Sequence, residues 1–265
     1  MTEVEKERAP AVLVHGTFIG TDDSFGPQRE LDGPVRLVVF ERRGYGSRAG
    51  APDPVLGWPA DAPDLQVLME RAGGAHLVGH SYGGVVVAAA ASRRPDLVRS
   101  LVLVEPALSQ AAADHPAIAA RMDRERAVFA RAHAMDAGAF TIEWMASMGA
   151  PPEAARAWIA TWTERERAAA EVCRRERWYG DAPIDFARLA AIGARKVVVM
   201  GAGRPPTTSG ADDAQDAVRI VCTALADRTG AELVRFESST HFPNTEEPER
   251  FNALLRDVWG ISPRG

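Results

Sequence analysis

A serine flanked by glycines stands between two short apolar runs. In residues 75–91, AHLVGHSYGGVVVAAAA, a strand-like pattern gives way to a helical one through Gly79-His80-Ser81-Tyr82-Gly83, a G-x-S-x-G turn. The glycines permit a sharp strand-to-helix turn that holds the Ser81 hydroxyl at the edge of a sheet. The N–H of Tyr82, at the start of the helix, can then point at a developing oxyanion. The stretch predicts Ser81 as a nucleophile and the Tyr82 N–H as an oxyanion donor.

A nucleophilic serine needs a base, because its neutral hydroxyl is a poor nucleophile near neutral pH. Of the six histidines, His241 alone stands between the last apolar run and the last helical segment, where an imidazole can reach Ser81 across the sheet edge. The other five lie in glycine-rich turns, at the start of an apolar run or in a helical region: His15, His80, His76, His115 and His133. We therefore predict that His241 is the base, and a carboxylate must hold its imidazole in the right tautomer.

The elements that must position these side chains follow from periodicity. Apolar runs predict strands at residues 11–15, 35–40, 75–80, 100–105, 195–201 and 231–236, and helical patterns occupy 63–73, 83–95, 213–230 and 247–260. Most of the runs are continuously apolar, which is typical of parallel strands covered on both faces. The predicted fold class is α/β, with a mostly parallel six-stranded sheet flanked by helices. Residues 109–190 lack a strand-like run, so we expect a helical cap there, between core segments 1–108 and 191–265.

Composition excludes several classes of function. The net charge of -5 does not indicate the basic surface that nucleic-acid binding needs. No stretch has the roughly 18 apolar residues that a membrane span needs. Cys173 and Cys222 have no metal-ligand spacing, and we expect both to be buried or free thiols. No metal, nucleotide or flavin motif is present, so we expect no cofactor and a small-molecule substrate as the partner. The charged N-terminus predicts a cytoplasmic protein, while a monomer and a homodimer both remain open.

Three further motifs give the chain a resemblance to the α/β-hydrolase superfamily. VLVHGTFIGTDDSF is similar to its H-G-x loop, VVFERRGYGSR to its D-x-R-G-x-G segment, and STHFPNTEEPERF to the segment around its catalytic histidine. The resemblance implies that His241 is the base and that the N–H of Thr17 is the second oxyanion donor, with Phe18 as the nearby alternative. It also places Trp178 and Tyr179, at the end of the cap, above the nucleophile, so that with Phe18 they are expected to bind substrate.

The superfamily's usual acid follows the strand VVVMG, but Gly203, Arg204 and two prolines occupy that slot. An arginine cannot accept a hydrogen bond from imidazole Nδ1. Glu105 ends the apolar run SLVLVE one strand earlier, and adjacent strands are only about 4.8 Å apart, so its carboxylate can approach the same imidazole. Some members of the superfamily place the acid there. Asp212, Asp213 and Asp216 remain the competing acids, although Asp212 more naturally caps a helix.

The expected function is a serine hydrolase that cleaves an ester or lactone of a small, largely apolar substrate through an acyl-enzyme on Ser81. The loop GAGRPPT combined with Glu105 is weakly similar to lactonases of the zearalenone type. A thioesterase or a carbon–carbon bond hydrolase would use the same triad, and a non-catalytic ligand-binding member of the fold is the alternative from another class. Fold does not choose among them.

Overall fold

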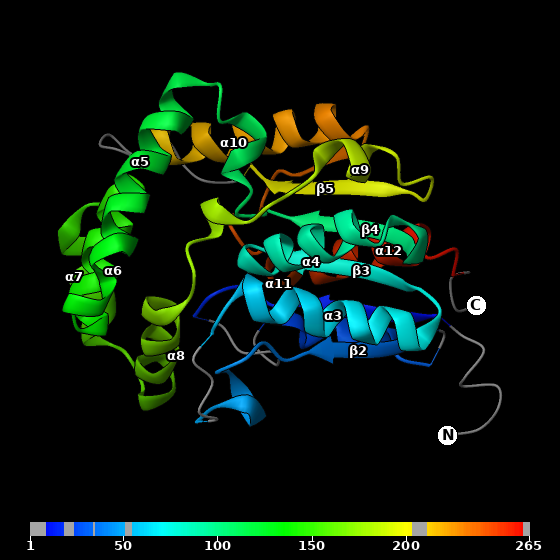
Figure 1. Cartoon of the computed structure of the whole chain (residues 1–265), viewed down its shortest axis with the longest axis horizontal. Coiled ribbons are helices and arrows are strands. Elements are labelled where there is room, and N and C mark those ends of the chain that lie inside the picture. Colours follow the sequence, from blue (N-terminus) through cyan, green and yellow to red (C-terminus); the bar gives the residue numbers. More distant parts are fainter. Residues whose placement is uncertain (1–8, 19–23, 34, 51–54, 203–210, 262–265) are drawn as a thin grey trace.

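A six-stranded parallel sheet forms the centre of the molecule (Figure 1). The computed structural model describes residues 9–18, 24–33, 35–50, 55–202 and 211–261, apart from the side chains of 211–215. The strands lie in the order β2-β1-β3-β4-β5-β6, and every neighbouring pair is parallel. Their bounds are β1 Pro10–Val14, β2 Arg36–Phe40, β3 Ala75–His80, β4 Val98–Val104, β5 Lys196–Gly201 and β6 Glu232–Phe236. The predicted fold class is confirmed, with each strand within two residues of its expected position.

Helices cover both faces of the sheet. On one face α3 (Trp58–Ala72), α4 (Tyr82–Arg93), α9 (Phe186–Ala190) and α10 (Ala211–Thr229) pack on one apolar cluster. On the other face α12 (Pro248–Val258) and the 3-10 helix η1 (Pro27–Leu31) pack on a second. Successive strand residues alternate between the clusters, for example Leu101 and Val102 on β4, because side chains along a strand point to opposite faces. The continuously apolar runs therefore reflect a sheet that is buried on both sides.

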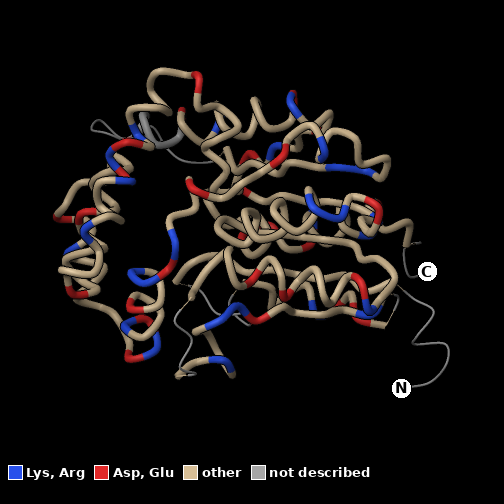
Figure 2. Tube along the Cα trace, in the orientation of Figure 1, with Lys and Arg blue, Asp and Glu red and all other residues tan. Residues whose placement is uncertain are grey.

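Helices α5 to α8 lie at one end of the helix-covered sheet, beyond the carboxyl ends of the strands (Figure 1). Their bounds are α5 Pro116–Arg131, α6 Ala137–Ser147, α7 Pro152–Ala160 and α8 Glu164–Arg175. Charged positions are frequent along α5 and α8 and sparse in the inner strands (Figure 2). In the charged run of α8, Ala169, Ala170, Val172 and Cys173 form the buried face. Within residues 109–190, α9 instead lies against α4 and α10.

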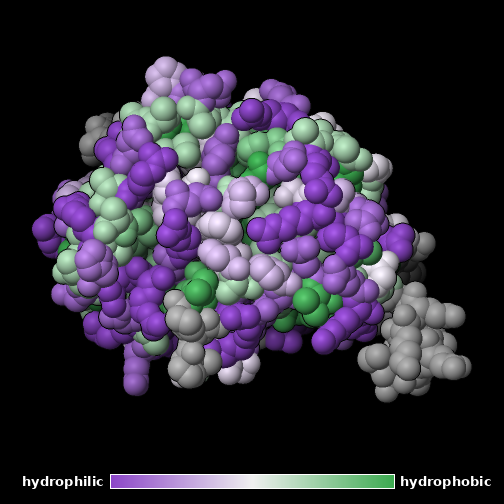
Figure 3. Space-filling view, viewed as in Figure 1, coloured by the Kyte–Doolittle hydropathy of each residue, from purple (hydrophilic) through white to green (hydrophobic). Residues whose placement is uncertain are grey.

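The remaining elements are short. They are the 3-10 helices η2 Gly46–Arg48, η3 Pro95–Leu97, η4 Ser109–Ala112, η5 Ala132–Ala134 and η6 Tyr179–Asp181, and the one-turn helix α11 Pro243–Glu246. The face in Figure 3 is mainly hydrophilic with scattered apolar groups. Among the described helices, none is both long and apolar enough to cross a membrane. Cys173 and Cys222 are buried and free.

Candidate active site

Ser81 lies in the turn between β3 and α4, where backbone packing explains the flanking glycines. Its φ of 53° is in the left-handed region. A Cβ on Gly79 would lie 2.6 Å from the Gly83 carbonyl oxygen, and one on Gly83 would lie 2.1 Å from that of Val14. The strand end and the helix start approach too closely for any side chain there. The turn therefore holds Ser81 in a conformation that residues other than glycine rarely adopt.

The loop after β1 lies directly against this turn. A Cβ on Gly16 would be 3.0 Å from Cβ of Ser81, so the Gly16 backbone borders the serine side chain. Thr17 and Phe18 follow and line the same cavity as Ser81. On the other side of Ser81, α4 begins at Tyr82, whose N–H is among the first four of the helix and has no acceptor within it. The structure thus places Tyr82 directly after Ser81 and Thr17 in the lining of the same cavity.

Glu105 and His241 meet at the end of the sheet. Nδ1 of His241 lies 2.9 Å from Oε2 of Glu105, and the N–H of Gly201 donates to Oε1 of the same carboxylate at 2.8 Å. Glu105 is 4% exposed, and its N–H continues the β4–β5 ladder by donating to the Val199 carbonyl at 2.9 Å. Because an ionised carboxylate only accepts hydrogen bonds, Nδ1 of His241 carries the imidazole proton and Nε2 is left as an acceptor.

The loop that carries His241 is held from two directions. Glu246 accepts the N–H and the hydroxyl of Thr240 at 2.5 and 2.6 Å, and Glu247 accepts the Ser239 hydroxyl at 2.6 Å. From the elbow, Nε2 of His80 donates to the His241 carbonyl at 2.9 Å. Burial, with the neighbouring His241 as a smaller cause, lowers the pKa of His80 to about 3, so its imidazole is neutral.

The sequence places His80 only in a glycine-rich turn and does not predict that its side chain holds the His241 main chain. His80 precedes Ser81 in the chain and also bonds the main chain of His241, so it links the position of the serine turn to that of the expected base. The sequence signal for this role is weak, because a bond to a carbonyl 161 positions away leaves no local pattern.

The non-glycine residues with positive φ gather at this site. In the described part of the chain they are Phe18 at 64°, Ser81 at 53° and Glu105 at 40°. All three line one cavity. Such conformations each cost on the order of 1–3 kcal/mol, and strained residues cluster where a function requires their geometry. The cavity is therefore the candidate active site on backbone evidence alone, independently of any motif.

The cavity has a volume of about 720 Å³ and lies between the sheet edge and the helices α5, α6, α7 and α10. Its lining is mainly apolar, with Trp144 and Met145 of α6, Met148 directly after it, Trp158 of α7, and Val218 and Val221 of α10. Phe18 and Tyr179, both expected to bind substrate, line it. Phe18 also stacks on Trp144, with ring centroids 5.8 Å apart. This is the size and character of a small-molecule site.

Trp178 does not belong to the described lining of this cavity, unlike Tyr179. Its indole is 4% exposed and lies beneath the guanidinium of Arg126, 4.6 Å from the ring centroid. Its carbonyl accepts the Trp58 indole N–H at 3.2 Å. The two rings lie close, with centroids 6.0 Å apart, yet of this pair Tyr179 alone belongs to the described lining.

The competing acids are placed differently. Asp216 is exposed and forms an ion pair with Arg219 at 3.0 Å. Because α10 begins at Ala211, Asp212 and Asp213 lie in its first turn. Arg204 and the segment around it, 203–210, lie outside the described residues.

A buried ionic network lies beneath the loop after β1. The fully buried Arg42 donates to Asp61 at 3.2 Å, to the Gly16 carbonyl at 3.0 Å and to Glu176. Thr17 donates its hydroxyl to the other oxygen of Glu176 at 3.4 Å. Burial raises the pKa of Glu176 to about 7, although Arg42 lowers it. Glu176, directly after α8, thus ties the loop after β1 to the helical segment. Nothing in its charged sequence run distinguishes it from its neighbours.

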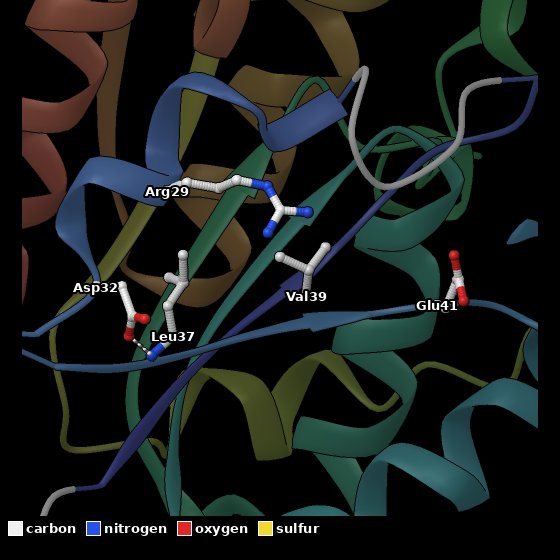
Figure 4. Close-up of a pocket in the computed structure, with 5 residues that line it drawn as sticks. All are labelled: Arg29, Asp32, Leu37, Val39 and Glu41. Atoms are coloured by element: carbon white, nitrogen blue, oxygen red, sulfur yellow. Dashed lines mark hydrogen bonds between the residues drawn. The ribbon is translucent and has the colours of Figure 1, made fainter. Parts of the chain in front are cut away.

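A second, smaller cavity of about 320 Å³ lies along the edge strand β2 (Figure 4). Arg29, Asp32, Leu37, Val39 and Glu41 line it, and Asp32 accepts the Leu37 N–H at 3.1 Å. It shares no lining residue with the larger cavity. Within the described residues, no group of three or more His, Cys, Asp or Glu side chains could hold a metal ion.

Comparisons with known proteins agree with this fold. The model of the alpha/beta hydrolase family matches residues 11–254. A search of curated proteins finds no match. A thermophilic esterase from Thermogutta terrifontis superposes with a TM-score of 0.60 at 24% identity, covering 94% of this chain and 88% of that one.

Two further structures are similar to this chain. An enol-lactonase from Burkholderia xenovorans has a TM-score of 0.63 at 16% identity, covering 96% and 92% of the two chains. A meta-cleavage product hydrolase from Pseudomonas fluorescens has a TM-score of 0.60 at 17% identity, covering 95% and 90%. At these identities the likeness shows the fold alone.

Proposed function

We propose that this chain, which belongs to the alpha/beta hydrolase family, is a serine hydrolase that cleaves an ester or lactone of a small, largely apolar substrate. The hydrogen bond of 2.9 Å between Nδ1 of His241 and Glu105 carries the proposal, because it sits in the lining of the cavity that also contains Ser81. Nucleophile, orienting acid and base then occur in the chain order that this fold uses.

In the proposed acylation step, Nε2 of His241 removes the hydroxyl proton while Oγ of Ser81 attacks the carbonyl carbon. The carbonyl oxygen becomes an oxyanion, which the N–H groups of Thr17 and Tyr82 stabilise. Glu105 stabilises the imidazolium that forms. When the tetrahedral intermediate collapses, His241 returns the proton to the leaving alkoxide, and an acyl-enzyme remains.

Deacylation repeats the same steps with water as the nucleophile. His241 removes a proton from water, whose oxygen attacks the acyl carbon, and the proton passes to Oγ of Ser81 as the acid product leaves. For a lactone the alkoxide stays attached to the acyl chain, so a single hydroxy acid is released. Each step uses groups of this chain and water.

The apolar lining supports a small, largely apolar substrate. A cavity of about 720 Å³ holds an acyl chain or a ring of moderate size. The similar structures include an esterase and an enol-lactonase. A panel of p-nitrophenyl esters with increasing acyl length, lactones with increasing ring size and matched thioesters would separate these substrate classes.

The proposal is tested by labelling with a fluorophosphonate, which reacts with an activated serine. We expect stoichiometric labelling of Ser81 and hydrolysis of p-nitrophenyl esters, with both lost in Ser81→Ala. The matched control is Ser92→Ala, a buried serine on α4 that bonds the Ala89 carbonyl. A folded wild-type protein that is neither labelled nor active would instead indicate the non-catalytic ligand-binding alternative.

A further inference from the structure

The large cavity contains one charged side chain that the proposed mechanism does not use. Arg121, on α5, lines the cavity, and its side chain is 17% exposed. Within the described lining, Arg121 alone carries a permanent positive charge. A guanidinium remains charged at every pH at which proteins are stable, so this charge faces a largely apolar space.

The partners of Arg121 use only part of its hydrogen-bonding capacity. Its Nε donates to Oε1 of the fully buried Glu125 at 2.7 Å, and the hydroxyl of Tyr179 donates to the other oxygen of that carboxylate at 2.5 Å. A guanidinium has five N–H donors. A second side-chain hydrogen bond joins Arg121 to Tyr179, so these two partners engage two of the five donors.

Glu125 and Tyr179 therefore fix the guanidinium of Arg121 and leave three of its N–H donors for a ligand. The planar guanidinium matches the two oxygens of a carboxylate. Tyr179 lies between Arg121 and the elbow, because its ring contacts that of Tyr82 with centroids 6.2 Å apart. A group bound at Arg121 must then be separated from the scissile carbonyl by a spacer.

We propose that the cavity binds a substrate with a carboxylate remote from the scissile ester, and that the remaining N–H donors of Arg121 bind this carboxylate. The substrate class is thus a half-ester of a dicarboxylic acid, or an ester or lactone with a free acid on its alcohol side. The apolar lining of α6 and α10 accommodates the chain between the two ends. That the other end of the substrate is an ester or lactone rests on the proposed function.

The kinetic test compares the monomethyl and dimethyl esters of dicarboxylic acids from succinate to suberate, and butyrate esters of hydroxy acids with their amides. We expect the wild type to prefer the charged member of each pair at one spacer length. Arg121→Met lowers this preference, measured as a ratio of kcat/KM values, by about ten- to a hundredfold, the usual effect of losing a charge-assisted hydrogen bond. Arg124→Met is the matched control on the same helix, since Arg124 is exposed and outside the cavity lining.

A binding test separates this inference from the proposed catalysis. In Ser81→Ala, calorimetry with monomethyl glutarate, adipate or suberate should show tighter binding than with the dimethyl ester, and adding Arg121→Met should remove the difference. This holds even if Ser81 proves unreactive. Because Arg121→Met leaves Glu125 buried without its cation, Arg121→Met with Glu125→Gln provides a second variant. An unchanged preference in the folded variants, or no preference in the wild type, would overturn the inference.

Discussion

Replacing Glu105 by glutamine changes one atom of its carboxylate and tests the proposed acid. The two carboxylate oxygens have different partners, since Oε1 accepts the Gly201 N–H at 2.8 Å and Oε2 faces Nδ1 of His241 at 2.9 Å. The amide oxygen of the variant can keep the bond to Gly201, because that N–H only donates. The amide NH₂ then faces Nδ1, and two donors cannot share a hydrogen bond.

The imidazole responds by moving its proton to Nε2, so that Nδ1 accepts from the amide. A protonated Nε2 cannot take the hydroxyl proton of Ser81. The equivalent change in a serine protease lowers kcat about 10⁴-fold through the same tautomer error. At about 1.36 kcal/mol per tenfold, this is about 5 kcal/mol of transition-state free energy. We therefore expect kcat/KM of Glu105→Gln on p-nitrophenyl butyrate to fall by about 10³- to 10⁴-fold.

Two comparison variants make the assay specific. Glu105→Asp keeps the charge but withdraws the carboxylate by one methylene, so its activity should lie between wild type and Glu105→Gln. Asp216→Asn removes only an exposed ion pair and should change kcat/KM by less than about twofold. If folded Glu105→Gln stays within tenfold of wild type while Asp212→Asn or Asp213→Asn loses activity, the acid lies on α10 and our assignment is wrong.

Three further predictions concern the supports of the site. Burial raises the folded-state pKa of Glu176 from 4.5 to about 7, so the folded chain retains a proton that the unfolded chain releases, and stability falls as pH rises across this window. Urea unfolding at about pH 5 and about pH 8 should show that Glu176→Gln gains about 2.5 kcal/mol of stability relative to wild type at the higher pH. A stability difference that does not change with pH would contradict this. His80→Leu removes the bond to the His241 carbonyl and should lower kcat about tenfold or more with little effect on KM; a kcat within twofold of wild type would show that the bond is dispensable. In Gly201→Ala the new Cβ would lie 1.7 Å from the Thr240 carbonyl oxygen, so melting temperature and kcat should both fall, whereas Gly193→Ala, with open space around it, should change neither.

The sheet and the nucleophile turn could be predicted from sequence because their causes are local. A strand buried on both faces must be apolar throughout, and β4 shows this along almost its whole length. The turn at Ser81 requires glycines at fixed offsets, because backbone atoms of β1 and α4 occupy the space of their side chains. Such constraints leave a pattern within a few residues of the chain.

Other parts of the site leave no such pattern. Phe18 and Glu105 adopt positive φ without being glycine, so their conformations depend on tertiary contacts rather than on residue type. Glu176 resembles its solvated neighbours in sequence, although it is buried against Arg42. Trp178 and Tyr179 are adjacent aromatics, yet only Tyr179 lines the cavity. The side chains that contact a ligand depend on how the helices pack, which spacing along one chain cannot specify.

The end of β5 gives a physical reason why the proposed acid lies directly after β4. The Gly201 Cα lies against the Thr240 carbonyl, so the loop that carries His241 occupies the space that a side chain at the end of β5 would need. Gly201 also donates its N–H to the Glu105 carboxylate. In this chain β5 therefore contributes a backbone donor to the carboxylate, and the neighbouring strand contributes the carboxylate itself. Since the N–H of Glu105 bonds to Val199 of β5, the position of the acid follows from the register of the sheet rather than from a flexible loop. Because the sheet fixes the proposed acid, Glu105 keeps His241 in the same tautomer for every ligand that the helical segment allows into the cavity.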